Sequence, residues 1–329
     1  MMKGLRSDPR LGVSHGVPGT IFALLRTALG QQPDYLHLDW IHQYYLRGSL
    51  WKTYLTLPLF YFEIWFISRF TSVRLVWTLH NLSPHGSSKK DKIAAQVRRY
   101  LAARVEFIRL FADCSVERAA EYLQCDRSKF RVVPEGSYVG YYPDTTTESA
   151  AKEKLGFPTD RRVMVNVGTI RPYKGLEKLI AAFSEIDDPD WMLVIAGAAW
   201  DRPYTDSLQQ LAASSPAAER IVFHLGIVPD EKLQYYLRAA DLAVFPFKSI
   251  ENSGSVILAM GFGLPVVTGN LGVPATRLSA QNRFLYEVNL TKTLTEAMLH
   301  SPEQLRAIGQ RNLQQLERHR WKDFAQVFV

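Results

Sequence analysis

Short apolar runs alternate with stretches of helical periodicity through the second half of the chain. The periodicity is clearest in Leu176, Leu179, Ile180 and Phe183, which recur at spacings of three, one and three residues. Apolar runs of the length of buried strands lie at residues 163–167, 191–196, 221–224, 242–247 and 265–268. Apolar strands that alternate with amphipathic helices predict a parallel sheet. We therefore expect one doubly wound α/β domain from about residue 155 to 310.

The first half carries the same two patterns less regularly. Strands are expected at residues 35–40, 73–79, 111–115 and 130–134. The aromatic-rich stretch 44–70 is predicted to be helical with a break at Pro58, and residues 89–110 to form a long basic helix. We expect a second α/β domain whose first strand is weak or missing, because residues 1–20 hold no apolar run. The stretch 142–151, with a proline and three threonines, is the predicted linker between the domains.

Length and composition agree with two globular domains. The chain has 329 residues, of which 47% are hydrophobic and 22% charged, a balance that argues against long disorder. The formal net charge of +7 favours anionic partners: nucleotides, nucleic acid or an acidic membrane surface.

The expected compartment follows from cysteine content and from the absence of a signal-like segment. Cys114 and Cys125 are too few for a disulfide framework or a cysteine-rich zinc site, which favours a reducing compartment. The N-terminus holds no apolar stretch like that of a signal peptide. The most apolar segment, 54–67, contains Pro58 and Glu63 and is too short to span a bilayer. We expect a cytoplasmic protein.

The strongest candidate site is the segment 168–175, which follows a predicted strand and precedes a predicted helix. In open α/β sheets, ligands bind beyond the carboxyl ends of the strands. Gly168 leaves room for a ligand, and Arg171 and Lys174 place two cations beside a helix N-terminus. This combination suits a diphosphate, and the cations would stabilise the charge that a leaving diphosphate gains. The alternative is a solvated loop with two surface charges.

A second candidate site lies at another predicted strand end, where the chain opens a helix. Its candidate nucleotide-binding residues are Glu251, Asn252, Ser253, Gly254 and Ser255. An N-cap side chain and the free N–H groups of the first turn could hold a phosphate, and the glutamate could hold ribose hydroxyls. A simple helix cap explains the same residues equally well.

His80, followed by Asn81 at the end of a first-half strand, is the third candidate. Two patterns resemble metal sites. Asp188 and Asp190 match a metal-binding D-x-D pattern but precede a strand, so they are expected to form a turn. His37, Asp39 and His42 have loose metal-like spacing; acceptor binding or packing explains them better than zinc does.

Four segments carry a family resemblance. Residues 163–183 and 242–267 resemble the donor-binding segment and the nucleotide-binding helix of retaining glycosyltransferases with the GT-B fold, a large family 4-like group that includes many bacterial cell-wall and exopolysaccharide sugar transferases. Residues 77–85, WTLHNLSPH, and 132–143 are similar to segments of a bacterial branch of that group.

The resemblance implies a fold and a domain plan. The fold would be GT-B, with two Rossmann-like doubly wound α/β domains facing a central cleft. Residues 1–148 would form the acceptor-binding domain, 149–312 the nucleotide-sugar domain, and 313–329 a helix crossing back to the first domain.

The resemblance also implies a reaction. A sugar would pass from a nucleoside-diphosphate sugar to a glycan or lipid-linked acceptor with retention of anomeric configuration, without a required metal or other cofactor. By position, Arg171 and Lys174 would contact the diphosphate, and His80 would lie near the donor sugar. Residues 252–255 would lie along the nucleotide. Ile250 and Leu258 stand where many relatives carry two glutamates.

Two other functions remain open. A sugar-nucleotide epimerase of similar fold would use the same donor, and a non-catalytic scaffold could have kept the fold without the paired glutamates. Nucleic-acid binding is not expected, because no basic stripe is interleaved with stacking aromatics.

A membrane partner is suggested by a basic run beside the aromatic stretch 44–70. The run consists of Lys89, Lys90, Lys92, Arg98, Arg99, Arg104 and Arg109. Such a juxtaposition suits the anionic inner face of a membrane, where the protein would be peripheral. A solvated basic helix packed beside a core helix is the alternative.

Overall fold

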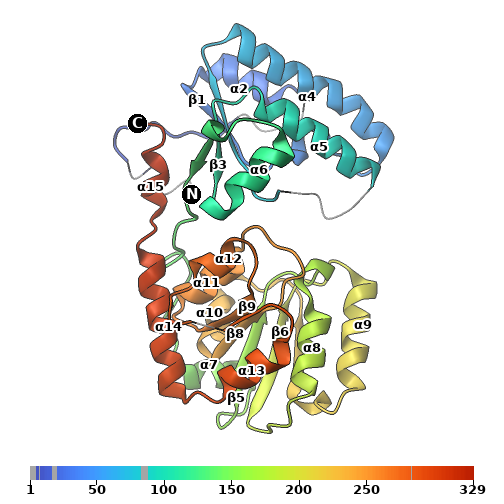
Figure 1. Ribbon diagram of the computed structural model, residues 1–329, viewed down its shortest axis with the longest axis vertical. Coiled ribbons are helices and arrows are strands. Elements are labelled where there is room, and N and C mark those ends of the chain that lie inside the picture. Colours follow the sequence, from blue (N-terminus) through green and yellow to red (C-terminus); the bar gives the residue numbers. More distant parts are fainter. Residues whose placement is uncertain (1–4, 7, 17–20, 83–87, 283) are drawn as a thin grey trace. The chain divides into compact units, whose positions relative to one another are not determined.

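The computed structural model describes all residues except 1–4, 7, 17–20, 83–87 and 283 (Figure 1). The chain forms two compact units, one of residues 1–136 and 320–329 and the other of residues 137–319. The first unit therefore ends earlier than the boundary of 148 expected from the sequence, and the second continues to residue 319 instead of 312. No helix among the described residues is long and apolar enough to cross a membrane.

The first unit is built on a four-stranded parallel sheet in the order β1-β2-β3-β4. The strands are β1 (Tyr35–Leu38), β2 (Arg74–Thr78), β3 (Phe107–Leu110) and β4 (Phe130–Val132). Its α-helices are α2 (Ala23–Gln31), α3 (His42–Tyr45), α4 (Leu50–Phe70), α5 (Lys89–Ala102), α6 (Val116–Leu123) and α15 (Trp321–Ala325). In the part of the chain that the structure describes, no strand precedes Tyr35, as the lack of an apolar run there predicted.

Side-chain alternation gives this sheet two different faces. Leu36 and Leu38 join the large core with α4 and α5, whereas His37 faces the other way and meets Phe324 of α15, with ring centroids 5.4 Å apart. The last helix of the chain therefore completes the core of the first unit.

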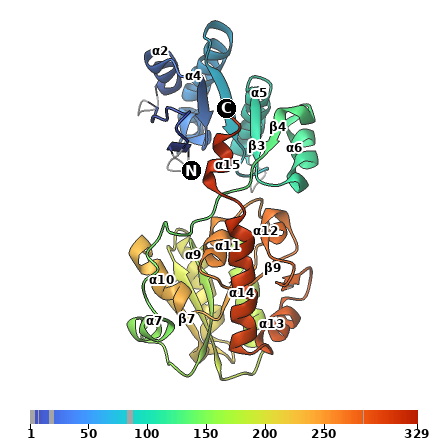
Figure 2. The ribbon, with the colours of Figure 1, turned by 90° about the vertical axis from the view of Figure 1, so that its left-hand side faces the viewer.

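The second unit contains a six-stranded parallel sheet in the order β10-β9-β8-β5-β6-β7. Its strands are β5 (Arg162–Val167), β6 (Trp191–Gly197), β7 (Ile221–Leu225), β8 (Leu242–Phe245), β9 (Val266–Gly269) and β10 (Leu285–Tyr286). Its α-helices are α7 (Glu148–Leu155), α8 (Leu176–Ser184), α9 (Arg202–Ala213), α10 (Asp230–Arg238), α11 (Gly254–Gly261), α12 (Gly272–Arg277), α13 (Leu290–Met298) and α14 (Pro302–Glu317). In Figure 2, α14 runs beside α11, with which it is in contact.

Both faces of this sheet are buried. Val163 and Val165 of β5 point into one hydrophobic cluster, and Met164 between them points into the other. A strand with cores on both sides reads as a continuous apolar run, which is why five of the six strands of this unit were predicted; the two-residue β10 was not.

Three predictions about local structure were wrong. The helix of the aromatic stretch does not break at Pro58: α4 runs through it. Pro58 lies on the exposed side of α4, where a carbonyl that loses its helical hydrogen bond can be solvated. The helix expected at 89–110 ends at Ala102, and β3 replaces the strand expected at 111–115. A buried Arg109 in β3 disguised this strand, because a basic residue fits a solvated helix better than a strand interior.

The stretch 142–151 is not a free linker. The backbone N–H of Thr145 donates to Oε1 of Gln234 at 2.9 Å, and Asp144 forms an ion pair with Arg238, both on α10. Thr147 then caps α7, accepting a hydrogen bond from the N–H of Ala150. These contacts explain why the stretch belongs to the second unit.

Candidate functional site

The strand order of the second unit creates a switch point between β5 and β8, where the winding of the sheet reverses. Such switch points are where ligands bind in doubly wound folds. The β5–β8 ladder stops at the pair Val165 and Ala243, while β5 continues to pair with β6 as far as Val167. Beyond the ladder, the side-chain amide of Asn166 donates to the carbonyl of Val244 at 2.6 Å. The two strands therefore separate toward their carboxyl ends, bridged by a side chain.

Three predicted residues meet at this point. A β-carbon built on Gly168 would lie 2.6 Å from Nζ of Lys174 and 3.1 Å from Oγ of Ser255. Gly168 also has a φ of 133°, which L side chains rarely adopt. Only glycine therefore lets the lysine and the serine converge over the end of β5.

Lys174 is a buried cation. Its exposure is 4%, and burial lowers the pKa of its ammonium group from 10.5 to about 8. Within the described residues, no carboxylate forms an ion pair with it. A buried charge without a countercharge is costly, and an anionic ligand would compensate for it.

Arg171 differs from Lys174 in its surroundings. It is exposed and precedes the short 3-10 helix Pro172–Lys174, which leads through Gly175 into α8. The two cations predicted as a pair thus share one loop, but only Lys174 lies buried beside Gly168.

The second predicted segment forms the start of α11. Ser253 is the N-cap, and its hydroxyl accepts a hydrogen bond from the N–H of Val256 at 3.3 Å. Gly254 and Ser255 form the first turn, and Asn252 is half-buried just before it. Because Ser255 lies near Lys174, the amino end of α11 faces the same point as the lysine.

Glu251 is 6% exposed, and its carbonyl accepts a hydrogen bond from the N–H of Val273 in α12 at 2.8 Å. A β-carbon on Gly272 would lie 2.3 Å from the carbonyl oxygen of Ile250. The loop before α11 is therefore packed closely against the start of α12. Leu258 lies inside α11 and lines a small pocket that Tyr138 and Tyr142 also line.

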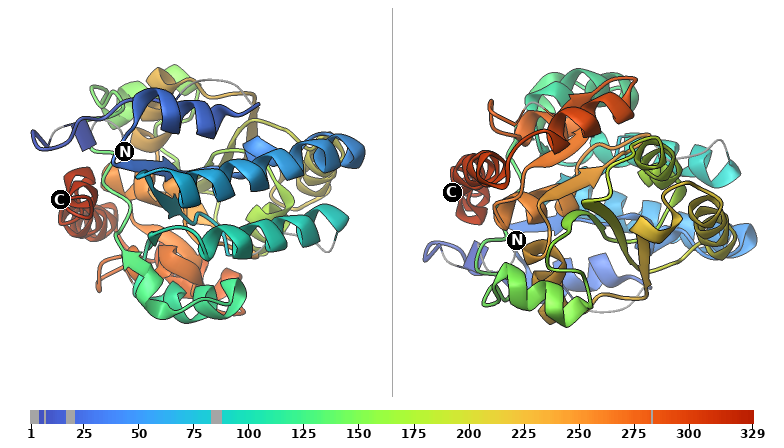
Figure 3. Two further views of the ribbon diagram at one scale, coloured as in Figure 1. Left: turned by 90° about the horizontal axis from the view of Figure 1, so that it is seen from above. Right: turned by 90° about the horizontal axis from the view of Figure 1, so that it is seen from below.

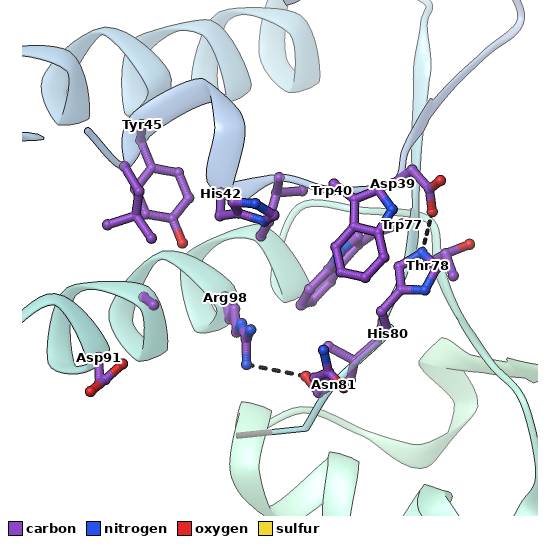
Figure 4. A pocket seen from close by; sticks show the side chains of 14 residues that line it. Asp39, Trp40, His42, Tyr45, Trp77, Thr78, His80, Asn81, Asp91 and Arg98 are labelled. Atoms are coloured by element: carbon purple, nitrogen blue, oxygen red, sulfur yellow. Dashed lines mark hydrogen bonds and ion pairs between the residues drawn. The ribbon is translucent and has the colours of Figure 1, made fainter. Parts of the chain in front are cut away.

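The first unit has a separate pocket at the carboxyl ends of β1 and β2. Register pairs Leu38 with Trp77. Asp39 directly follows β1 and His80 lies two residues beyond the end of β2, so both lie at neighbouring strand ends. Nε2 of His80 is hydrogen-bonded to a carboxylate oxygen of Asp39. The ring of Trp40 stacks on that of His80, with centroids 4.0 Å apart and planes at 10° (Figure 4).

The pocket has a volume of about 220 Å³ and is lined by both aromatic and charged side chains. Arg98 enters it from α5, and its guanidinium donates to the carbonyls of Asn81 and Leu82 at 3.1 and 3.0 Å. His42 also lines the pocket. Aromatic faces beside hydrogen-bonding groups are what a carbohydrate needs from a protein surface.

His37 on β1 and Asp39, which directly follows that strand, both have lowered pKa values. Burial, together with the nearby cation Arg109, lowers the pKa of His37 to about 4 despite the opposing charge of Asp39, so His37 is neutral at pH 7. It is hydrogen-bonded to the hydroxyl of Thr78 at 2.8 Å. For Asp39, burial raises the pKa, but the hydrogen bond from His80 and nearby positive charge outweigh it and lower the pKa. Asp39 is therefore an ionised partner for His80.

The two metal-like patterns gain no support. Over the described residues, no group of three or more His, Cys, Asp or Glu side chains is placed to hold a metal ion. Asp188 and Asp190 form a turn before β6, in which the N–H of Asp190 donates to Oδ1 of Asp188 at 3.0 Å.

Sequence reasoning missed the pairing of His80 with Asp39, the stacked Trp40 and the bridging Asn166. The first two follow once β1 and β2 are known to be neighbours, because Asp39 and His80 each follow a strand. Asn166 left a weaker signal: it is the one polar residue in the apolar run 163–167.

Solved structures share the fold. Sucrose-phosphate synthase from Thermosynechococcus elongatus superposes with a TM-score of 0.72 at 18% identity, over 94% of this chain and 75% of that one. Anabaena HepE in complex with UDP-glucose gives a TM-score of 0.73 at 16% identity, over 93% and 80% of the two chains. The predicted fold class, two Rossmann-like α/β domains as in GT-B glycosyltransferases, is confirmed.

Sequence relatives are glycosyltransferases. The chain is 27% identical over 318 residues to the GDP-mannose:glycolipid 4-beta-D-mannosyltransferase of Xanthomonas campestris pv. campestris, covering 93% of this chain and 81% of the relative. It is 31% identical over 182 residues to the GDP-mannose-dependent alpha-(1-6)-phosphatidylinositol monomannoside mannosyltransferase of Mycolicibacterium smegmatis, covering 51% and 46%. Residues 147–314, more than half of the chain, match the family described as glycosyl transferases group 1. The chain belongs to this family.

Proposed function

We propose that the protein transfers a hexosyl group from a nucleoside-diphosphate sugar to a glycolipid or other lipid-linked glycan precursor. The observation that carries the proposal is Lys174, a buried cation without a carboxylate partner among the described residues, at the switch point of the second unit. The names of two relatives support it, since both specify GDP-mannose as donor and a lipid-linked acceptor. The complex of HepE with UDP-glucose supports a nucleotide-sugar donor in the same fold.

The donor diphosphate would bind at the end of β5. Lys174, Ser255 and the first-turn N–H groups of α11 would contact it. The exposed Arg171, which shares a loop with the lysine, would also contact it. These groups stabilise the negative charge that the diphosphate gains as the glycosidic bond breaks. The proposal includes no metal, because the chain supplies this charge itself.

The nucleoside would extend along the loop before α11. Asn252 and Ser253 lie there, Gly254 begins α11, and the buried Glu251 is the acidic residue of this loop that would meet ribose hydroxyls. Glu251 is held against α12 through its carbonyl, which fixes the backbone from which its side chain extends.

The first unit would bind the acceptor and present His80. The carboxylate of Asp39 holds the ring through Nε2, so that Nδ1 is the nitrogen left to meet a substrate group. The aromatic wall of Trp40 suits the apolar face of a sugar ring.

Retention of anomeric configuration is part of the proposal and rests on the resemblance of the donor segment. Transfer from an α-linked donor to an α-linked product retains the configuration, and transfer to a β-linked product inverts it. The relatives' names specify a β product in one case and an α product in the other. The anomeric configuration of the product tests retention directly. A β product from an α-linked donor would overturn it and would give Nδ1 of His80 the role of base for the acceptor hydroxyl.

A ligand-binding and product assay tests the proposed function. Saturation with the correct nucleotide sugar should raise the melting temperature. At a ligand concentration of 100 Kd, binding adds about 2.7 kcal/mol to the free energy of unfolding. UDP, GDP, ADP and dTDP sugars should be compared, with Lys174→Met as the variant that loses the shift. If the protein epimerises the donor without an acceptor, its function is that of a sugar-nucleotide epimerase and not of a transferase. Absence of any shift and any turnover with all donors would leave the scaffold alternative.

A further inference from the structure

One long helix of the first unit carries an apolar stripe that the unit leaves uncovered. The buried side of α4 is formed by Thr53, Phe60, Glu63, Ile64 and Ile67, which pack toward the sheet. Its opposite side bears the exposed large hydrophobic residues Trp51, Tyr54, Leu55, Phe62 and Trp65, with exposures between 42% and 65%, and Phe70 is exposed at its carboxyl end.

The spacing of these residues makes them continuous. Trp51, Leu55, Pro58, Phe62 and Trp65 follow one another at steps of four, three, four and three, which places them along a single line on a helix. The outer side of a helix in a globular protein is normally polar. A line of exposed apolar residues over four turns therefore marks a contact surface.

Charges on α4 are arranged around this stripe and not within it. Every residue of α4 is described, and its only acidic residue, Glu63, is buried and accepts a hydrogen bond from the N–H of Leu25 at 3.0 Å. The exposed charges are Lys52 near the amino end and Arg69 near the carboxyl end. Two cations at the ends of an apolar stripe match the anionic head groups that border the hydrocarbon of a bilayer.

Neighbouring helices extend the surface. Figure 3 (left) shows α4 between α2 and α5 in one layer of helices. The ring of Phe22, just before α2, meets that of Phe62 edge-on at 6.2 Å, and Ile21 beside it is exposed. From α5, Nζ of Lys90 donates to the carbonyl of Gly48 at 2.7 Å, so the basic start of that helix is tied to the start of α4.

Most side chains of the basic run that was expected to attract the membrane instead contact other groups of the first unit. Arg109 is buried and donates to the carbonyls of Val133 and Pro134. Arg98 binds the carbonyls beside the pocket, and the guanidinium of Arg104 stacks on the ring of Tyr100, 3.6 Å from its centroid. The apolar stripe, rather than this run, is the stronger feature.

We propose that the exposed side of α4 inserts into the interface of a lipid bilayer. Tryptophan, tyrosine and phenylalanine are the side chains suited to that depth, and the cations at the two ends of α4 contact head-group phosphates. The inference deepens the proposed function, on which it rests only for the lipid-linked acceptor that the membrane would supply.

Flotation of the full chain with vesicles tests the proposal. Vesicles of phosphatidylcholine alone and of phosphatidylcholine with phosphatidylglycerol are compared at low and high salt. The wild type should float with both, more with the anionic vesicles, and high salt should remove only the difference, because apolar insertion is not screened. The double variant Trp51→Ser, Trp65→Ser should lose at least about tenfold in partitioning to both.

Matched variants separate the apolar from the electrostatic contribution to membrane binding. Trp200→Ser removes from the second unit a tryptophan as exposed as Trp51 and should leave flotation unchanged. Lys52→Gln with Arg69→Gln should weaken binding to anionic vesicles alone. Because the replaced side chains are exposed, the variants should keep the melting temperature of the wild type and its response to nucleotide sugar.

Three results would overturn the proposal. The wild type could fail to float with either vesicle, or the double tryptophan variant could float as well as the wild type. Alternatively, light scattering could show a dimer that the same double variant dissociates, which would assign the stripe to a second copy of the chain. A wild type that floats but shows no response to any donor would instead refute the proposed function and leave the membrane surface standing.

Discussion

Nε2 of His80 and a carboxylate oxygen of Asp39 share a hydrogen bond, although the residues are 41 positions apart in the sequence. The ionised carboxylate favours the tautomer of His80 that carries its proton on Nε2, leaving Nδ1 as the basic nitrogen. The stacked ring of Trp40 holds the imidazole from one side. The hydrogen bond and the stacked ring therefore fix the orientation and the tautomer of His80.

Loss of either partner should impair transfer through the same step. We expect His80→Ala to lower kcat/KM by about 10²–10³, within the range of positioned acid–base groups, and Asp39→Asn by about tenfold or more. The double variant should be no worse than His80→Ala, because Asp39 acts through the histidine. Steady-state kinetics of the four proteins measure this. His42→Gln, which changes another residue of the same pocket, serves as the control and should keep most of the activity; additive losses in the double variant would refute the linkage.

Lys174 should be required for donor binding and should lower the stability of the ligand-free protein. Its pKa of about 8, against 10.5 when solvated, corresponds to about 3 kcal/mol of unfavourable burial at neutral pH. Lys174→Met should therefore raise the free energy of unfolding of the ligand-free protein by on the order of 1–3 kcal/mol while weakening donor binding at least tenfold. Lys178→Met, on the exposed side of α8, should change neither quantity appreciably. Urea unfolding and donor titration decide: a variant that is destabilised and still binds the donor would show that the lysine is structural.

His37 should make the first unit less stable in mild acid. Its folded-state pKa of about 4 lies below the ordinary value of 6.5, so the unfolded chain binds the proton more tightly. Its contribution to stability is complete above pH 6.5 and is lost as the pH falls toward 4, by up to about 3 kcal/mol. Urea unfolding between pH 7 and pH 4.5 should show this loss. His37→Gln, which can keep the hydrogen bond to Thr78, should reduce the slope; an unchanged slope would assign the acid sensitivity to other groups.

The central strands β5, β6, β8 and β9 were predictable because each is buried on both faces, whereas β10, only two residues long, was not predicted. Met164 and Val165 enter opposite cores, so no polar position interrupts the run enough to hide the strand. In β3 the pattern failed at Arg109. Its guanidinium is satisfied by the carbonyls of Val133 and Pro134, more than 20 residues away, and only the tertiary structure shows that such partners exist.

Some residues of the candidate sites could likewise be predicted from the sequence, whereas others depend on the tertiary structure. Gly168 and Lys174 could be predicted from one local rule, because a strand end followed by a helix start is where a parallel sheet binds its ligand. The pairing of Asp39 with His80 needed the order of the strands, which a single sequence does not show. That Arg171 is exposed while Lys174 is buried depends on the direction of the short helix Pro172–Lys174, which no residue pattern in the loop predicts.

Gly168 should be required for the donor site and not merely for the turn. A methyl group there would lie 2.6 Å from Nζ of Lys174 and 3.1 Å from Oγ of Ser255, so Gly168→Ala must displace the lysine, the serine or the strand end. It must also accommodate a side chain at a φ of 133°. We expect a loss of on the order of 1–2 kcal/mol in stability from the backbone conformation and at least a tenfold increase in the donor dissociation constant.

A second glycine separates the two effects. Gly156 ends α7 with a φ of 71°, and a β-carbon there would meet nothing within 4 Å. Gly156→Ala should therefore show the cost of a positive φ, about 1 kcal/mol, with donor binding unchanged. Calorimetric titration of both variants with the nucleotide sugar, beside their unfolding curves, measures the difference. If Gly168→Ala binds the donor as tightly as Gly156→Ala does, then the close approach of Lys174 and Ser255 over the end of β5 is not what holds the diphosphate.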